Sequence, residues 1–246
     1  MFETLYRFST YFVCCDGASN RLYDRYQSME GGGPIPTHIV GDLDSAKPEV
    51  IDFYKDKGVT CIANPEDQDS TDLQKSIRCI VECISSNPFI PNEESKNEYR
   101  ERNDKIIILF PFGGRIDHTL GSMHTLCKLH AETYPTTVEY ILMDETSTMQ
   151  CLGVGENIIL PSKIQSNLGC GVIPLMGKCT KIKTSGLRWN MDYDNSHDKE
   201  ATWLLEFGGT LISTSNEYTE DEINIDSDTQ LVWTTTLKRF YEEGEP

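Results

Sequence analysis

The chain has 246 residues, 38% of them hydrophobic and 25% charged, which is ordinary for a soluble globular protein. Its formal net charge of −17 argues against DNA or RNA as a partner, because backbone phosphates require basic patches. No apolar run approaches the roughly 20 residues of a membrane-spanning helix, so we expect no membrane contact either.

The first half of the chain alternates short apolar runs with helical patterns, which predicts an open, mostly parallel α/β domain of the Rossmann-like kind. The run 105–112 (KIIILFPF) is uninterruptedly apolar, which is typical of a central strand covered on both faces. The polar stretch 87–104 predicts a surface insertion or a mobile loop. We expect strands at 10–15, 38–40, 59–63, 105–112 and 138–143, and helices at 18–26, 48–57, 70–84 and 117–131.

After about residue 144 the pattern changes to short alternating runs separated by Gly, Asn, Asp and Pro. No helical periodicity is evident there, so this half predicts an all-β sandwich of about 100 residues. We therefore expect an α/β domain over 1–145 and a β-sandwich domain over 146–246. The expected strands are 148–152, 157–160, 171–175, 179–184, 203–207, 210–215, 222–226 and 230–237.

The nine cysteines are odd in number, scattered and without a CxxC pair. They show no zinc-ligand spacing with the five histidines. We interpret them as reduced, mostly buried residues of a cytosolic protein. The first residues also lack the basic-then-apolar order of a signal peptide, so the expected location is cytoplasmic.

The most informative motif is HIVGDLDS at 38–45, where a short apolar run ends in Gly41 and two carboxylates follow. Extended backbone would point Asp42 and Asp44 the same way. At about 4–5 Å their repulsion is roughly 3–4 kcal/mol at an effective dielectric near 20, which a bound cation would relieve. Oxygen ligands suit Mg²⁺. The alternative is a simple turn before the next helix.

A second acidic cluster, DQDSTD, occupies 67–72. It could complete a metal site, but the local pattern favours helix capping. In that interpretation Asp69 is the N-cap and Asp72, three residues later, lies in the first turn, where a carboxylate is favourable by about 0.3–1 kcal/mol.

A third polar segment, Gly113-Gly114-Arg115, follows the strongest predicted strand. A strand, two glycines and a helix can offer backbone N–H groups to an anion, and Arg115 is placed to bind a phosphate. The alternative is a tight turn into a helix capped by Asp117. The segment is not a Walker A loop, since it lacks GK[ST].

Together with Asp16, which follows the first predicted strand, these segments all come directly after strands. In open α/β sheets ligands bind beyond the carboxyl ends of the strands, so the pattern predicts metal-assisted phosphate chemistry on one edge. An aspartyl-phosphate phosphotransferase is disfavoured because Ala46 stands where Thr or Val belongs. A nucleotide-sugar transferase, which also uses Asp-x-Asp, stays open.

Seven segments, in the same order along nearly the whole chain, resemble the eukaryotic thiamine pyrophosphokinases. The family's architecture, α/β followed by a β-sandwich, is also the one predicted above. The segments are CDGASNRLYD (15–24), GDLDS (41–45), DQDSTD (67–72), GGRIDH (113–118), CGVIPL (170–175), TSGLRWN (184–190) and GTLISTSN (209–216).

The resemblance implies transfer of diphosphate from ATP to the hydroxyl of thiamine, giving thiamine diphosphate and AMP. It implies a homodimer with the thiamine pocket at the dimer interface. By the same resemblance, the Mg²⁺ ligands and catalytic residues are Asp42, Asp44 and Asp72, with Asp16 nearby. The ATP side is lined by Gln68, Asp69, Arg115 and Asp117, and the thiamine pocket by Trp189, Ser213, Ser215 and Asn216.

Two features depart from the family pattern. Family members begin with a further strand and a longer helix, whereas Met1 lies within what resembles that helix. Residues 191–201 resemble an insertion close to the expected thiamine segment. A catalytically impaired thiamine- or nucleotide-binding module is therefore the second hypothesis, beside the diphosphotransferase.

Overall fold

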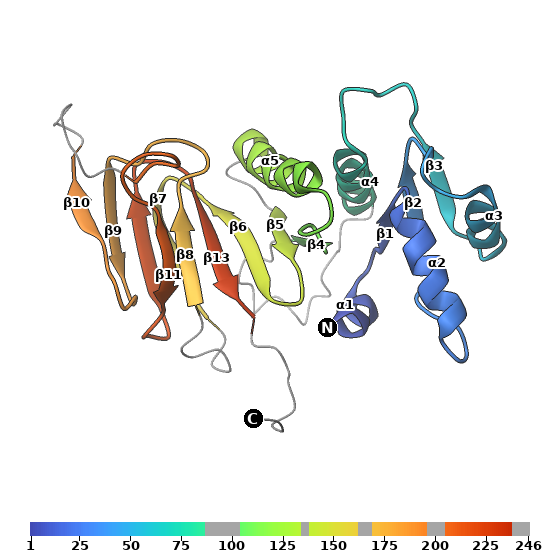
Figure 1. Ribbon diagram of the computed structural model, residues 1–246, viewed down its shortest axis with the longest axis horizontal. Helices are drawn as coiled ribbons and strands as arrows, with labels where there is room; N and C mark the ends of the chain where they lie inside the picture. Colours follow the sequence, from blue (N-terminus) through green and yellow to red (C-terminus); the bar gives the residue numbers. More distant parts are fainter. Residues whose placement is uncertain (87–103, 134–137, 162–168, 196–204, 238–246) are drawn as a thin grey trace, which may run out of the picture. The chain divides into compact units, whose positions relative to one another are not determined.

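The computed structural model describes residues 1–86, 104–133, 138–161, 169–195 and 205–237. The chain forms two compact units, Met1–Arg100 and Glu101–Pro246 (Figure 1). The predicted insertion at 87–104 lies outside the described residues, apart from Asp104.

The first unit is an α/β unit built on a three-stranded parallel sheet in the order β1-β2-β3. Each strand ends where a predicted polar segment begins. Its elements are α1 (Phe2–Phe8), β1 (Val13–Cys15), α2 (Ala18–Ser28), β2 (His38–Gly41), α3 (Pro48–Asp56), β3 (Thr60–Ala63) and α4 (Asp72–Ser86).

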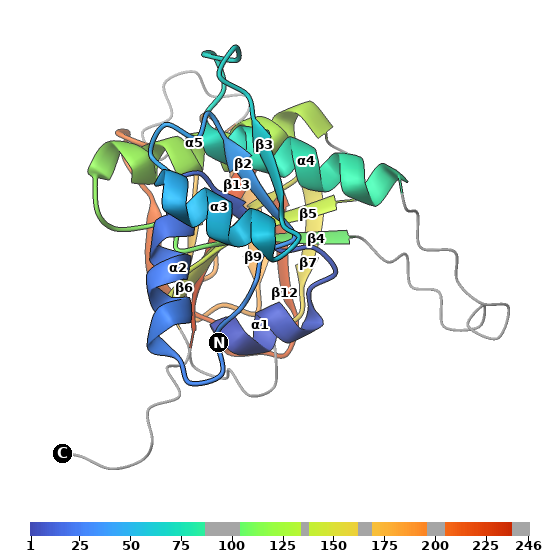
Figure 2. The same cartoon turned by 90° about the vertical axis from the view of Figure 1, so that its right-hand side faces the viewer.

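Helices cover both faces of this sheet (Figures 1 and 2). Helices α2 and α3 pack against each other over one face, where the buried side chains of Ile39, Leu22, Val50 and Tyr54 form the core. Helix α4 packs on β1 and β2 from the other face. The alternation of side chains along β2 therefore directs His38 toward α4 and Ile39 toward α2 and α3.

The described residues of the second unit form one helix and two sheets. The six-stranded sheet has the order β11-β8-β13-β6-β5-β4, and the four-stranded sheet has the order β10-β9-β12-β7. All pairs are antiparallel except β4–β5. The elements are β4 (Asp104–Leu109), α5 (Ile116–Thr133), β5 (Val138–Met143), β6 (Ser147–Leu152), β7 (Gly155–Ile159), β8 (Gly169–Ile173), β9 (Lys181–Ser185), β10 (Asp192–Asp194), β11 (Ser213–Glu217), β12 (Ile223–Ser227) and β13 (Leu231–Thr236).

The core of this unit lies between its two sheets. Leu231 and Trp233 from β13 join Ile182 from β9 and Ile225 from β12 in one buried cluster. Two sheets that share a core in this way form a β-sandwich. The predicted fold class, a parallel α/β part followed by a β-sandwich, is confirmed.

Two details of the predicted strands are wrong. Strand β4, expected at the centre of the first sheet, is an edge strand of the sandwich, where among the described residues it pairs only with β5. Residues 192–194, part of the predicted insertion 191–201, form β10 beside β9, and the insertion itself stays a prediction. Of the expected strand 203–207, the described part makes only isolated bridges at Leu205. The apolar pattern of a strand does not specify which strands lie beside it in a sheet, which explains the unexpected place of β4.

The predicted division at residues 145 and 146 concerns sequence domains and stays a prediction. The compact units differ from it because β5 continues into β6 through an antiparallel pairing, in which Leu142 lies opposite Met149. This pairing ties β4 and β5 to the later strands. Within the described part of the chain, no helix combines the length and the apolar character needed to cross a membrane.

The sandwich core provides a test of the fold. Ile225 is fully buried, whereas Ile158 on the neighbouring strand β7 is 57% exposed. We expect Ile225→Ala to lower the free energy of unfolding by about 2–5 kcal/mol, because it leaves a cavity between the sheets. Ile158→Ala should change it by about 0.5 kcal/mol or less. Urea denaturation of both variants checks this; equal losses would contradict the assigned core.

Candidate active site

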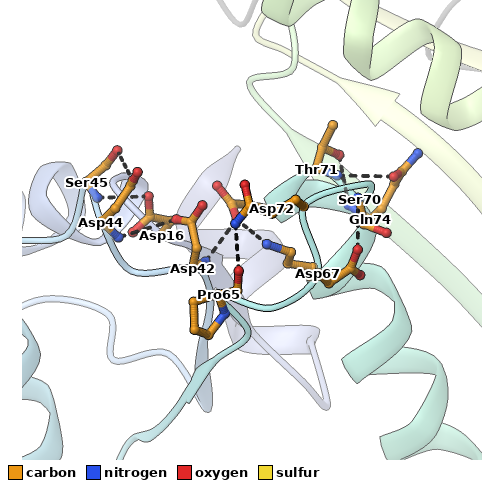
Figure 3. Close-up of polar contacts among 12 residues, drawn as sticks. Asp16, Asp42, Asp44, Ser45, Pro65, Asp67, Ser70, Thr71, Asp72 and Gln74 are labelled. Atoms are coloured by element: carbon orange, nitrogen blue, oxygen red, sulfur yellow. Dashed lines mark hydrogen bonds and ion pairs between the residues drawn. The ribbon is translucent and has the colours of Figure 1, made fainter.

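Three carboxylates converge in the first unit, where two parallel strands end beside the start of a helix. Asp16 follows β1, Asp42 follows β2, and Asp72 is the first residue of α4. One oxygen atom from each carboxylate lies within 4.8 Å of the others (Figure 3). Of the four carboxylates predicted to lie together, Asp16, Asp42 and Asp72 are thus close to one another in the structure, and Asp44 is not in the group.

Asp16 is 4% exposed, and backbone N–H groups hold its carboxylate in place. Its Oδ1 accepts a hydrogen bond from the N–H of Ala46 at 3.0 Å, and its Oδ2 accepts one from the N–H of Ser45 at 3.3 Å. These bonds fasten the loop that follows β2 to the end of β1. They also partly compensate the buried negative charge.

Gly41 explains why the chain can bring these groups so close together. A Cβ atom at this position would lie 2.7 Å from the Cβ of Asp16 and 3.0 Å from Oδ1 of Asp72. Any larger residue would therefore push the carboxylates apart. The glycine of GDLDS is required by close packing, since its φ is not among the positive values.

Asp72 has the most perturbed environment of the three. Burial raises the pKa of its carboxyl, and repulsion from Asp42 and Asp16 raises it further. Two contacts oppose this rise: the Asp42 N–H donates to Asp72 Oδ1 at 3.2 Å, and Lys75 Nζ lies 3.7 Å from the same atom. Lys75 is itself 4% exposed, so the cluster has a buried cation beside it that the sequence motifs did not reveal.

The expected cap of α4 is wrong. Thr71, not Asp69, caps the helix: Thr71 Oγ1 accepts from the Gln74 N–H at 3.3 Å, and Gln74 Oε1 accepts from the Thr71 N–H at 3.2 Å. This reciprocal pair is a capping box. Because Thr71 and Gln74 cap the helix, Asp72 is free to face the other carboxylates (Figure 3).

The remaining residues of this loop face outward. Asp67 accepts from Arg78 at 2.8 Å, and this hydrogen bond lowers the pKa of Asp67. Gln68 donates to the carbonyl of Pro65 at 2.6 Å, and Asp69 is exposed. The loop thus holds two of the predicted ATP-side residues, Gln68 and Asp69, at the surface of the first unit.

Asp44, a predicted metal ligand, does not belong to the close group of carboxylates. Its side chain is exposed and accepts a hydrogen bond from Ser45 Oγ at 2.9 Å. Its N–H donates to Asp42 Oδ1 at 3.3 Å, which helps to orient Asp42. Leu43, between the two aspartates, has a φ of +61°, so the backbone here is a turn and not an extended strand.

In the second unit, the predicted anion segment forms a turn between β4 and α5. Gly113 and Gly114 have φ values of +91° and +66°, which only glycine adopts readily. Arg115 makes a two-point ion pair with Asp117, at 2.5 and 3.1 Å, and both side chains are mostly exposed. This pairing raises the pKa of Arg115 and lowers that of Asp117.

The predicted thiamine-side residues also come together. Asn216 is 2% exposed; its Oδ1 accepts from the Trp189 N–H at 3.1 Å and its Nδ2 donates to the Trp189 carbonyl at 2.9 Å. Asn216 Nδ2 lies 3.4 Å from Ser213 Oγ, and Ser215 has a φ of +58° in the irregular part of β11. Asn216 thereby holds the backbone that presents Trp189.

Trp189 is 54% exposed, which is unusual for a tryptophan beside a sandwich core. The guanidinium of Arg188 lies 4.7 Å from the centre of its ring and pairs with Glu217 at 2.9 Å. Arg188 was not among the predicted site residues, although it directly precedes one of them. Arg188 covers part of the ring, and the rest of its exposed surface is available to a ligand.

The three carboxylates of the first unit fit a small hard cation. In an octahedral Mg²⁺ site with bonds of 2.0–2.1 Å, ligand oxygens lie about 2.9 Å apart when adjacent and about 4.2 Å apart when opposite. The three carboxylate oxygens lie up to 4.8 Å apart, so they need to move together only slightly to reach these distances. Gly41 leaves that space open, and all three donors are oxygens, as Mg²⁺ prefers.

A carboxylate cluster beyond the carboxyl ends of parallel strands is typical of enzymes that act on phosphate groups. The family model described as "Thiamin pyrophosphokinase, catalytic domain" matches residues 2–138. The model described as "Thiamin pyrophosphokinase, vitamin B1 binding domain" matches residues 156–232. The chain belongs to the thiamin pyrophosphokinase family.

Individual relatives agree with this assignment. Thiamine pyrophosphokinase 1 of Arabidopsis thaliana is 34% identical over 238 residues, and thiamine pyrophosphokinase 1 of Oryza sativa subsp. japonica is 31% identical over 236 residues. Both matches cover 92% of this chain and 78% of the relative. The solved structure of thiamin pyrophosphokinase from Candida albicans has the same fold, with a TM-score of 0.74 and 23% identity over 96% of this chain and 85% of that chain.

The raised pKa of Asp72 predicts a pH effect on stability without divalent cations. A carboxyl whose pKa is raised on folding binds its proton more tightly in the folded state. Its contribution to stability is therefore fully present below the ordinary value of 3.8 and is lost as the pH rises through the raised value.

As the pH rises from 3.8 through the raised pKa, the free energy of unfolding of the wild type should fall relative to that of Asp72→Asn. The measurement is urea denaturation of both proteins in a chelator, at several pH values from 3 to 7. A constant difference between the two proteins across the interval would contradict the raised pKa.

Proposed function

We propose that this chain is a thiamine diphosphokinase, which transfers the terminal diphosphate of ATP to the hydroxyl of thiamine. The bond that forms joins the thiamine oxygen to the β-phosphorus, the bond that breaks joins the α- and β-phosphates through oxygen, and AMP leaves. The convergence of Asp16, Asp42 and Asp72 around Gly41 carries this proposal, together with the family membership.

Asp16, Asp42 and Asp72 are the proposed Mg²⁺ ligands, and Asp44 has the supporting role of orienting Asp42. Mg²⁺ held there would neutralise charge on the phosphates of ATP and align the β-phosphorus with the thiamine hydroxyl. The backbone N–H groups of Ser45 and Ala46 donate hydrogen bonds to Asp16. The backbone N–H of Asp42 donates one to Asp72. The hydroxyl proton would pass to a nearby carboxylate, Asp72 or Asp44.

Gln68, Asp69, Arg115 and Asp117 are the proposed residues on the ATP side. Arg115 presents a planar guanidinium that suits phosphate oxygens, and in the described structure Asp117 holds it in a two-point ion pair. An incoming phosphate would compete with Asp117 for this guanidinium. The ion pair is exposed and therefore contributes little to stability, so its rearrangement is inexpensive.

Trp189, Ser213, Ser215 and Asn216 are the proposed thiamine-side residues. A cationic ligand is attracted to the face of a tryptophan ring, and Trp189 is exposed and positioned by Asn216. We also propose a homodimer that completes this pocket, and a cytoplasmic location, since all nine cysteines are free thiols.

The decisive experiment is to incubate the protein with Mg²⁺ and ATP, with and without thiamine, and to quantify AMP and thiamine diphosphate. Equal amounts of both products, formed only with thiamine, support the proposal. Binding of thiamine without turnover would identify an impaired binding module, and AMP formation without any dependence on thiamine would contradict the proposal.

Asp42→Asn keeps the shape of the side chain and removes one ligand charge. We expect turnover to fall by at least about 100-fold, because loss of metal coordination removes several kcal/mol of stabilisation of the transition state. The shift of the melting temperature with Mg²⁺ should also disappear. Asp52→Asn, an exposed position on α3, is the control and should behave like the wild type. Near-normal activity of Asp42→Asn would remove Asp42 from the metal site.

Trp189→Ala tests the thiamine side alone. Loss of the ring should raise the KM for thiamine by about 2- to 30-fold, which corresponds to about 0.5–2 kcal/mol of cation–π attraction, and leave the KM for ATP unchanged. Phe207→Ala removes another exposed aromatic ring of the second unit, 64% exposed, and is the matched control. A similar rise in both variants would show that general surface packing, and not a specific contact, is responsible.

A further inference from the structure

A second group of metal-ligating side chains lies in the first unit, away from the carboxylates. It consists of His38, the first residue of β2, and of Cys79 and Cys83, one helical turn apart on α4. One ligand atom from each residue lies within 4.8 Å of the others, and Cys83 Sγ is 4.0 Å from His38 Nε2. We propose that these three residues bind a thiophilic metal ion, with Zn²⁺ as the fitting ion.

The separations suit such an ion. With Zn–S bonds of about 2.3 Å and Zn–N bonds of about 2.0 Å, neighbouring ligand atoms of a tetrahedral site lie about 3.5–3.8 Å apart. The three atoms in the structure need to close by about 1 Å to reach this geometry. Two thiolates and one imidazole are soft or borderline ligands, which select Zn²⁺ over Mg²⁺. The fourth position is left to water or a small ligand.

The hydrogen bonds around His38 set the ring for metal binding. Thr37 Oγ1 donates to the carbonyl of Phe12 at 2.9 Å, so the same oxygen accepts from His38 Nδ1–H at 3.0 Å. These bonds favour the tautomer with the proton on Nδ1, in which Nε2 presents its lone pair toward Cys83. A metal-bound histidine is held by its other ring nitrogen in the same way.

The helix that carries the cysteines is also held in place. Tyr11 Oη donates to the carbonyl of Cys83 at 3.2 Å, across 72 positions of sequence. Cys79 is 8% exposed, so a bound ion would be shielded on one side by the packing of α4 on the sheet. Cys83 and His38 are partly exposed, which gives an ion a route to the site.

Occupation of this site would require two thiols to lose their protons. Burial raises the pKa of the Cys79 thiol to about 11, with a further contribution from Cys83. Zn²⁺ binding should release protons and become tighter as the pH rises. The site joins β2, which Asp42 directly follows, to α4, which begins with Asp72, so the ion would stabilise the framework of the candidate active site.

The test is a Zn²⁺ titration of the full chain after chelator treatment, with a chromophoric chelator as the competitor. Saturating Mg²⁺ is present throughout, so that the carboxylates are occupied. We expect one Zn²⁺ per chain, with affinity reduced at least about 10-fold in Cys83→Ser and in His38→Gln. Both side chains are partly exposed, so these variants should fold. Cys61→Ser, at a half-buried thiol on β3, is the matched control and should bind like the wild type.

Co²⁺ provides a readout that does not depend on catalysis. It should give a near-ultraviolet thiolate-to-metal absorption band that Cys83→Ser weakens and that Asp42→Asn leaves unchanged. The Asp42→Asn arm separates this proposal from the proposed function, because loss of turnover there leaves the band intact. Absence of the band, or equal Zn²⁺ affinity in Cys83→Ser, His38→Gln and Cys61→Ser, would overturn the proposal.

Discussion

The candidate active site depends on the close approach of β2 to the first turn of α4 at Gly41. A side chain there would collide with Asp16 and Asp72, so the absence of a Cβ atom is the condition under which three carboxylates can meet. Unit charges about 4–5 Å apart repel by roughly 3–4 kcal/mol at an effective dielectric near 20. The unit therefore concentrates negative charge at a cost to its own stability, as sites for cations commonly do.

The structure offsets part of this repulsion with fixed donors. Two backbone N–H groups bind Asp16, one binds Asp72, and the buried Lys75 lies beside Asp72. Hydrogen bonds to charged groups contribute about 1.5–3 kcal/mol each. All of these donors are groups of the chain itself. The pKa of Asp72 stays raised, first by burial and then by repulsion from Asp42 and Asp16, and a bound cation would compensate both.

Local pattern predicted most of the first unit and the closeness of three carboxylates, but not the separate place of Asp44. The carboxylates follow strands, and parallel strands end at one edge of a sheet, so the grouping of Asp16, Asp42 and Asp72 was predictable. The exclusion of Asp44 was not, because the positive φ of Leu43 breaks the alternation that a strand would impose. The capping box of Thr71 and Gln74 was not predictable, because Asp69, two positions before Thr71, is also a favourable N-cap residue. In the second unit, the edge position of β4 depends on pairing partners that are distant in sequence.

The same reasoning explains why the cysteine–histidine cluster is invisible in the sequence. Cys79 and Cys83 share one helix face, but His38 is 45 positions from Cys83 and reaches it only because α4 packs across β2. Strand β2 begins with the imidazole of His38, and the carboxylate of Asp42 lies just beyond its end. Helix α4 begins with the carboxylate of Asp72, and its two thiols follow two and three turns later. Hard and soft ligands are separated along the same pair of elements. Because side chains alternate along β2, His38 and Val40 face α4 while Ile39 packs into the opposite core, so a one-residue shift of register would disrupt the core and the cysteine–histidine cluster together.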